Sequence, residues 1–338
     1  MQKTLPSLLP SFLPSFLPSL LSGACFLSLI TACAPEAIGQ AATKAPYAAP
    51  RTSFGQPSLE GTWTQNFVIL MESTSRAPML VLPEAAAKQM AAAAADGIGN
   101  ALDHGLDPEV PELMKATDGL PLVRGERRTR SVVLPEDGKL PYTEAARKES
   151  SRGPANNQMD SYEVRPNWER CITSLGLPPV TGMGTTSVNP RQIIQSPGQV
   201  VIHTEYGDEA RIIPITGAHK PKALYSTLGD SIARWDGDTL VIETIGMPAN
   251  DRVRFFSNLI VTADSKVIEK FTRLSEDELL YQYTVEDPAI YTAPWLAEYS
   301  LYRTNVRMFE HACHEGNHSL PNIMLAARMK EHRAAEAK

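Results

Sequence analysis

The sequence predicts a mainly β protein: an antiparallel β-barrel of lipocalin-like type or a β-sandwich, with a few peripheral helices and a C-terminal helical segment. From residue 191 onward, short apolar runs are separated by turn signals at regular spacing, which is typical of many-stranded antiparallel folds. Within this region apolar and polar side chains alternate, as expected of a half-buried strand: Leu279, Tyr281, Tyr283 and Val285 alternate with Gln282, Thr284 and Glu286.

The composition limits the class of protein. The chain has 338 residues, with 32 Lys+Arg against 38 Asp+Glu, a formal net charge of −6 and 43% hydrophobic residues. This balance excludes a disordered acidic tail protein. It also argues against nucleic acid as a partner, because there is no basic excess to neutralise phosphates. The length is enough for one large domain or two small ones.

The first 33 residues are predicted to be a signal peptide. Lys3 precedes an apolar run that ends in Ile-Thr-Ala-Cys33, as in a secretory signal. This ending looks like the lipobox of bacterial lipoproteins. The resemblance implies that Cys33 becomes the acylated N-terminus, so that the protein is exported and attached to the periplasmic face of the envelope, at the outer membrane. An ordinary cleavage near Ala34 stays open, as does an uncleaved membrane helix, which four prolines disfavour.

Residues 34–57 are rich in Ala, Pro, Gly, Ser and Gln and are predicted to be a flexible tether. Of the four cysteines, Cys25 and Cys33 lie in the signal, which leaves Cys171 and Cys313. Because an exported chain meets an oxidising compartment, these two are expected to form a disulfide. Two buried free thiols are the alternative.

The β-rich domain is expected over 58–305. A strand opens at Gly61 and runs to about Met71, and an Ala-rich helix follows over 83–95, with Pro at its start and Gly97 after its end. Residues 97–190 lack a clear period and are treated as an irregular insertion, with a strand at 130–133, a turn at 136–138 and a short helix at 143–149.

The strands after residue 190 are expected at 193–194, 200–205, 210–215, 232–235, 239–245, 259–262, 267–274, 279–285 and 294–303. Asp236-Gly237-Asp238 is predicted to be a hairpin turn. It lacks the twelve-residue calcium pattern. Residues 306–338 are expected to be helical, packed on the same domain, with a break near Pro321.

Seven segments together resemble a family of uncharacterised exported bacterial proteins. They are ERC at 169–171, QSPG at 195–198, ARIIP at 210–214, GDS at 229–231, RWDGDTLV at 234–241, DPAIYTAPW at 287–295 and ACHEGN at 312–317. The match covers essentially the whole mature chain and implies export and the fold, but no reaction. The chain departs from the family pattern at 297–305 and at His311 and His318.

One candidate site is the histidine-rich segment His311, His314, Glu315 and His318, with the spacing H-x-x-H-E-x-x-H. The H-E-x-x-H spacing is that of zinc proteases, in which two imidazoles on one helix face bind zinc and the Glu polarises its water. His311 would supply a third ligand. Gly316 and Asn317 are poor helix formers, so a polar turn with structural hydrogen bonds, or a metal-free acid/base role for His314, stays open.

A second candidate site is a group of charged residues within apolar strands. Side chains of this group that point into a barrel must pair there, and could then bind or ionise a small substrate. Side chains that point outward would form ordinary cross-strand pairs. The group comprises Glu205, Arg211, Arg234, Glu243 and Glu269. The candidate catalytic residues are therefore His314, Glu315, Glu205, Arg211 and Glu269.

The sequence supports three functional hypotheses. The first is a lipid-anchored periplasmic protein that binds a small apolar molecule and could transform it by acid/base chemistry. The second is a zinc-dependent hydrolase built on the HEGNH segment; no other cofactor is expected, since Gly-rich phosphate loops and a G-x-S-x-G elbow are missing from the sequence. The third is a structural envelope lipoprotein with a protein partner.

Overall fold

The computed structural model describes residues 47–65, 70–75, 77–90, 92, 120–151, 159–173, 176–180, 189–248 and 259–337. Residues from Pro46 to Lys338 form one compact unit. The predicted signal peptide and Cys33 lie outside the described residues. The predicted tether was expected to end at residue 57, but the folded unit begins near residue 46. Ala49 is already buried, and the Pro57 carbonyl accepts a hydrogen bond from Gln195 of the sheet.

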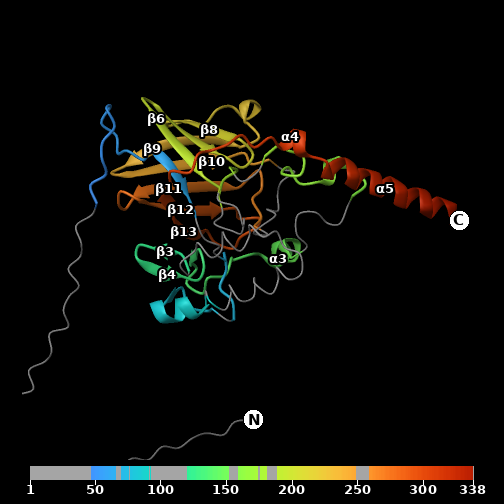
Figure 1. Ribbon diagram of the computed structural model, residues 1–338, viewed down its shortest axis with the longest axis horizontal. Helices are drawn as coiled ribbons and strands as arrows, with labels where there is room; N and C mark the ends of the chain where they lie inside the picture. Colours follow the sequence, from blue (N-terminus) through green and yellow to red (C-terminus); the bar gives the residue numbers. More distant parts are fainter. Residues whose placement is uncertain are drawn as a thin grey trace, which may run out of the picture. The chain divides into compact units, whose positions relative to one another are not determined.

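Nine strands form one continuous antiparallel path (Figure 1). Their order is β8–β7–β6–β1–β13–β12–β11–β10–β9. Their bounds are β1 Gly61–Thr64, β6 Arg191–Ser196, β7 Gln199–Thr204, β8 Glu209–Pro214, β9 Asp230–Asp236, β10 Thr239–Ile245, β11 Lys266–Arg273, β12 Glu278–Glu286 and β13 Trp295–Arg303.

The two edges of this sheet meet. Ile215, directly after β8, forms a parallel bridge with Ala233 of β9. The path therefore closes almost completely into a barrel, which leaves few unpaired edge groups. The predicted antiparallel β-barrel is confirmed, and the sandwich alternative is not what the chain adopts.

Tight turns set the register of the hairpins. Gly198 between β6 and β7 and Gly237 between β9 and β10 both have positive φ, at 83° and 57°, a conformation that glycine adopts without a steric penalty. The predicted Asp236-Gly237-Asp238 turn is confirmed, with Asp236 paired to Thr239. This register places every second residue of β9 and β10 on the inner face of the barrel.

A small three-stranded sheet and β5 accompany the barrel. The small sheet consists of β2 (Val81–Leu82), β3 (Leu122–Val123) and β4 (Glu126–Arg128), and β5 (Val132–Leu134) pairs with β13. Arg128 of β4 reaches Glu298 on the outer face of β13 at 3.2 Å. These segments cover β13 from outside, which is why its outward residues Glu298 and Ser300 are buried.

The helices are short, apart from the last. Residues 84–90 are helical within the predicted 83–95 segment, and of residues 91–95 only residue 92 is described. The predicted helix at 143–149 is confirmed as α3 (Glu144–Ser150), and the Thr143 side chain accepts the Ala146 N–H at its start. Two 3₁₀ turns cover Tyr162–Val164 and Lys222–Leu224.

The C-terminal segment contains α4 (Cys313–Gly316) and α5 (Ser319–Glu336). The helical break lies at Asn317 and not near Pro321 as predicted. Pro321 falls in the first turn of α5, where the missing N–H has no intrahelical partner to lose. No helix of the described residues is long and apolar enough to cross a membrane.

Two segments cover the ends of the barrel. At one end, Gln195 of β6 accepts the Leu59 N–H at 2.6 Å and donates to the Pro57 carbonyl at 3.1 Å. At the other end, residues 176–180 make hydrogen bonds to β8, β12 and β13. The candidate site lies at this second end.

Candidate functional site

A buried ion pair crosses the interior of the barrel between β8 and β11. Nη2 of Arg211 lies 2.6 Å from Oε2 of Glu269, and Nη1 lies 3.1 Å from Oε1. The side chains are 4% and 0% exposed. Of the five charged strand residues singled out in the sequence, these two are brought together, in the inward orientation that requires pairing.

Three hydroxyl groups complete this polar cluster. The Tyr281 hydroxyl donates to Oε1 of Glu269 at 2.8 Å. Nη2 of Arg211 also donates to the Ser231 and Thr244 hydroxyls, at 3.1 and 3.2 Å. We call Arg211, Ser231, Thr244, Glu269 and Tyr281 the interior cluster. Its members come from five strands, because alternation turns one residue from each toward the same space.

The surroundings of the interior cluster favour the protonated forms of Tyr281 and Arg211. Burial raises the pKa of the Tyr281 phenol well above its usual value, and the negative charge of Glu269 adds to this. Burial acts to lower the pKa of the Arg211 guanidinium, but the charge and hydrogen bond of Glu269, together with the nearby Tyr281 and Glu209, raise that pKa overall. Tyr281 therefore remains a hydrogen-bond donor near neutral pH and Arg211 remains a cation, so these two groups orient and do not exchange protons.

Aromatic rings surround the interior cluster. The Tyr281 ring lies 4.8 Å from Phe271, 5.5 Å from Tyr283 and 5.2 Å from Tyr299, measured between centroids. The ring planes are tilted or edge-on, as aromatic pairs prefer. We call these four rings the aromatic wall. An apolar wall next to a few fixed polar groups is the usual composition of a small-molecule site.

Residues 176–180 lie against both features. The Val180 N–H donates to the Tyr281 hydroxyl at 3.0 Å, and the Tyr299 hydroxyl donates to the Val180 carbonyl at 2.8 Å. The Gly176 N–H donates to Oε2 of buried Glu209 at 2.6 Å. A Cβ on Gly176 would lie 2.6 Å from that same oxygen, so glycine permits this close approach.

The other three charged strand residues lie elsewhere. Arg234 is exposed on β9. Glu243 lies on the outer face of β10, where it accepts a contact from His219 at 3.2 Å. Glu205, just after β7, accepts the Phe309 N–H at 2.8 Å. Alternation along β9 and β10 directs Arg234 and Glu243 to the outer face, and Glu205 lies beyond the last residue of β7. These three residues therefore do not join Arg211 and Glu269.

The histidine-rich segment does not form the continuous helix that the zinc hypothesis requires. Asn317 has φ −82° and ψ 69°, which ends α4 between His314 and His318. The two imidazoles therefore are not one helical turn apart, and that expectation is wrong because Gly316 and Asn317 do not continue the helix. His314, Glu315 and His318 are exposed. Within the described part of the chain, no group of three or more His, Cys, Asp or Glu is placed to hold a metal.

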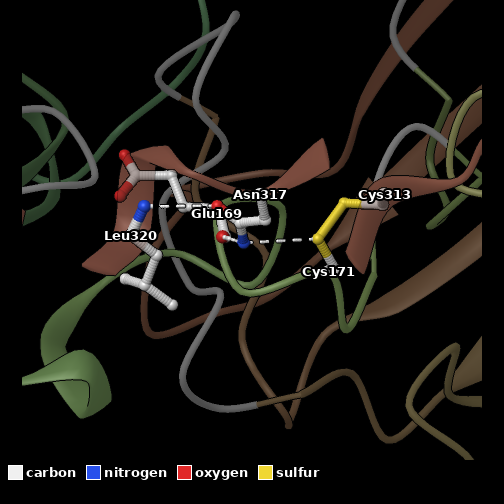
Figure 2. Close-up of a disulfide and its surroundings, with 5 residues drawn as sticks. All are labelled: Glu169, Cys171, Cys313, Asn317 and Leu320. Atoms are coloured by element: carbon white, nitrogen blue, oxygen red, sulfur yellow. Dashed lines mark hydrogen bonds between the residues drawn. A yellow bond between two sulfur atoms is a disulfide. The ribbon is translucent and has the colours of Figure 1, made fainter. Parts of the chain in front are cut away.

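The predicted disulfide between Cys171 and Cys313 is confirmed (Figure 2). Nδ2 of Asn317 donates to the Glu169 carbonyl at 2.7 Å and lies 3.4 Å from Sγ of Cys171, and Oδ1 accepts the Leu320 N–H at 3.2 Å. Asn317 therefore joins α4, α5 and the 169–171 segment. The non-helical backbone at Asn317 allows its side chain to make these hydrogen bonds.

A pocket of about 400 Å³ adjoins the disulfide. His311 lines it and stacks on Tyr206 with 4.3 Å between ring centroids. Of the histidines proposed as zinc ligands, His311 alone lines this pocket.

Sequence reasoning did not identify Ser231, Thr244 or Tyr299 as site residues. The alternation in 279–285 does place Tyr281 on the buried face. Nothing in the sequence distinguishes Ser231 and Thr244 from other small polar strand residues, because their role depends on the strand across the barrel.

No protein-family model and no curated protein matches the chain. Among solved structures, the chain is similar to a secretory abundant heat soluble (SAHS) protein from Ramazzottius varieornatus, at 14% identity and a TM-score of 0.25, over 41% of this chain and 87% of that one. That similarity is too low to carry an argument. Function is therefore inferred from the residues of the chain itself.

Proposed function

We propose that the protein binds a small, mostly apolar molecule at the end of the barrel covered by residues 176–180. The observation that carries this proposal is the aromatic wall set against a buried, fixed interior cluster. The wall offers apolar contact and the cluster offers donors and acceptors that orient a ligand. Residues 176–180 are held to this site by hydrogen bonds through the backbone of Val180, so they can yield to a ligand without breaking a side-chain ion pair.

The proposal is for binding and not for proton transfer. Both oxygens of Glu269 already accept hydrogen bonds from Arg211, and Oε1 also accepts one from Tyr281. These hydrogen bonds fix the orientation of the carboxylate and leave Oε2 with room for one further donor. The interior cluster is thus suited to orient a bound molecule, as in a carrier.

We further propose that this carrier works on the periplasmic side of the envelope, attached to the membrane by acylated Cys33. Support comes from the lipobox-like Ile-Thr-Ala-Cys33 sequence and from the disulfide, which suits an oxidising compartment.

Binding can be measured with N-phenyl-1-naphthylamine, an uncharged apolar dye that fluoresces when it leaves water. We expect saturable binding of about one dye per chain, and nuclear Overhauser contacts between the dye and the rings of Phe271, Tyr281 and Tyr299. Phe271→Leu should weaken the binding severalfold, because it removes one ring of the aromatic wall.

Phe309→Leu is the matched control, since Phe309 is 66% exposed and lies outside the wall. The same substitution there should leave dye binding unchanged. If no saturable binding is seen, or if Phe271→Leu and Phe309→Leu have equal effects, the proposal is wrong.

A further inference from the structure

A second arginine, Arg191, points into the barrel. It is the first residue of β6 and pairs with Trp63 of β1 and Thr204 of β7. Alternation along β6 puts Arg191 on the same inner face as Ile193 and Gln195, and its side chain is buried with 5% exposure of the residue. It therefore shares the interior with the interior cluster.

Unlike Arg211, Arg191 lacks a counter-ion. Its Nε and Nη1 atoms are buried without a hydrogen-bond partner, and in the described part of the chain it forms no ion pair. It also does not stack on its neighbour Trp63, whose ring is faced by Arg273 and Arg303 at 5.7 and 4.6 Å. A buried guanidinium without a counter-ion or hydrogen-bond partners lowers the stability of the folded protein.

Tyr299 and Glu209 are two inward residues that bear on the surroundings of the Arg191 charge. The positive charge of Arg191 acts to lower the pKa of the Tyr299 phenol, against the larger rise that burial causes, so the charge of Arg191 is felt at the aromatic wall. The backbone of Glu209 lies two strands away in the register Arg191–Thr204–Glu209, about 10 Å at ordinary strand spacing, and its Oε2 already accepts the Gly176 N–H.

We propose that Arg191 is the anchor for an anionic group on the ligand, so that the molecule bound in the barrel is a small apolar acid: a carboxylate, or an anion of the same shape such as a sulfonate. The inference rests on the proposed function and deepens it. The apolar body would lie against the aromatic wall while its anionic oxygens accept from the unpartnered nitrogens of Arg191. Such a charge-assisted contact is among the stronger hydrogen bonds in proteins.

A pair of dyes tests this directly. 1-Anilinonaphthalene-8-sulfonate has the same body as N-phenyl-1-naphthylamine plus one sulfonate. We expect the wild-type protein to bind the sulfonate at least about tenfold more tightly than the neutral dye, the effect of one hydrogen bond to a charged group. Arg191→Met should remove this preference and leave affinity for the neutral dye within about twofold, whereas Arg191→Lys should retain part of it.

Arg234→Met, on the exposed surface of β9, is the matched control and should keep the full preference. The melting temperature of ligand-free Arg191→Met should equal or exceed that of the wild type, because an unpaired buried charge is removed. A marked fall would show instead that Arg191 is paired in the folded protein, and would overturn the inference.

The two proposals fail differently. If the neutral dye shows no saturable binding, the proposed function fails. If both dyes bind equally well to the wild type, or if Arg234→Met removes the preference as much as Arg191→Met does, the barrel still binds apolar molecules but Arg191 is not an anion anchor.

Discussion

At the scale of single residues, Arg191 and Arg211, two of the buried arginines on the barrel strands, have different surroundings. Arg211 has Glu269 within 2.6 Å, while the buried Nε and Nη1 of Arg191 have no partner. Both face inward by the same alternation, so their strand positions alone do not separate them. The difference lies in which residue stands opposite, and this makes Arg211 an orienting group and Arg191 the proposed contact for a ligand.

The Arg211–Glu269 pair should show the behaviour of a buried ion pair. Arg211→Met or Glu269→Gln alone should each lower the free energy of unfolding by about 3–5 kcal/mol, because each leaves a buried group without its partner. The double variant Arg211→Met/Glu269→Leu should recover a large part of that loss. Denaturant unfolding of the four proteins measures this coupling.

The exposed pair of Arg51 and Asp238 provides the comparison. Its N–O distance is 2.7 Å, close to that of the buried pair, but its side chains are 53% and 43% exposed. Asp238→Asn should cost no more than about 1 kcal/mol. Equal losses at the buried and exposed pairs would contradict the assignment of Arg211 and Glu269 to the interior.

At the scale of elements, the disulfide reinforces a contact between α4 and the 169–171 segment that is otherwise held by the side-chain hydrogen bonds of Asn317. α4 has four residues and none of them is buried, and a helix of that length is not stable alone. Cys313 fastens it to the 169–171 segment across a sequence separation of 142 residues. Cys171, Cys313 and Asn317 of this junction line the pocket beside His311.

Removing the disulfide should therefore lower the free energy of unfolding and increase local opening of the segments 169–172 and 313–320. In the chain-entropy model, a loop of this length gives a stabilisation of about 5 kcal/mol. We expect the Cys171→Ser/Cys313→Ser variant to lose several kcal/mol in denaturant unfolding and to show faster hydrogen exchange at 169–172 and 313–320. Unchanged exchange in those segments would mean that Asn317 and its hydrogen bonds hold the junction without the disulfide.

At the scale of the whole molecule, the fold begins near residue 46, well after the proposed acylation site at Cys33. The barrel is covered at one end by 57–59 and at the other by 176–180. The proposed binding end is the one at which residues 176–180 contact the aromatic wall through Val180.

Anchoring through Cys33 has its own test. Cys33→Ser should abolish incorporation of labelled palmitate and move the protein from the detergent phase to the aqueous phase in detergent partitioning, because the acyl chains provide the membrane affinity. Cys25→Ser should change neither property, since Ser22 rather than an apolar residue stands three positions before it. Equal loss in both variants, or in neither, would contradict lipidation at Cys33.

Much of the architecture could be predicted because it is local. The period of two in 279–285, the Asp236-Gly237-Asp238 turn and Thr143 before α3 each depend on neighbours within a few residues. The break in the C-terminal helix was predicted near Pro321 but lies at Asn317. The sequence could not show this, because Asn317 makes hydrogen bonds to Glu169 and Cys171, which are far away in sequence.

The sequence by itself predicted a mainly antiparallel β fold, either a barrel or a sandwich, with Arg211 and Glu269 on strands, and favoured a disulfide between Cys171 and Cys313, since composition, alternation and cysteine number carry that information. Only the tertiary structure decided which charges meet. Barrel closure brings β8 opposite β11, and among the residues that the structure describes it leaves Nε and Nη1 of Arg191 without a hydrogen-bond partner. Such pairings depend on the order and register of strands far apart in sequence, which no local pattern specifies.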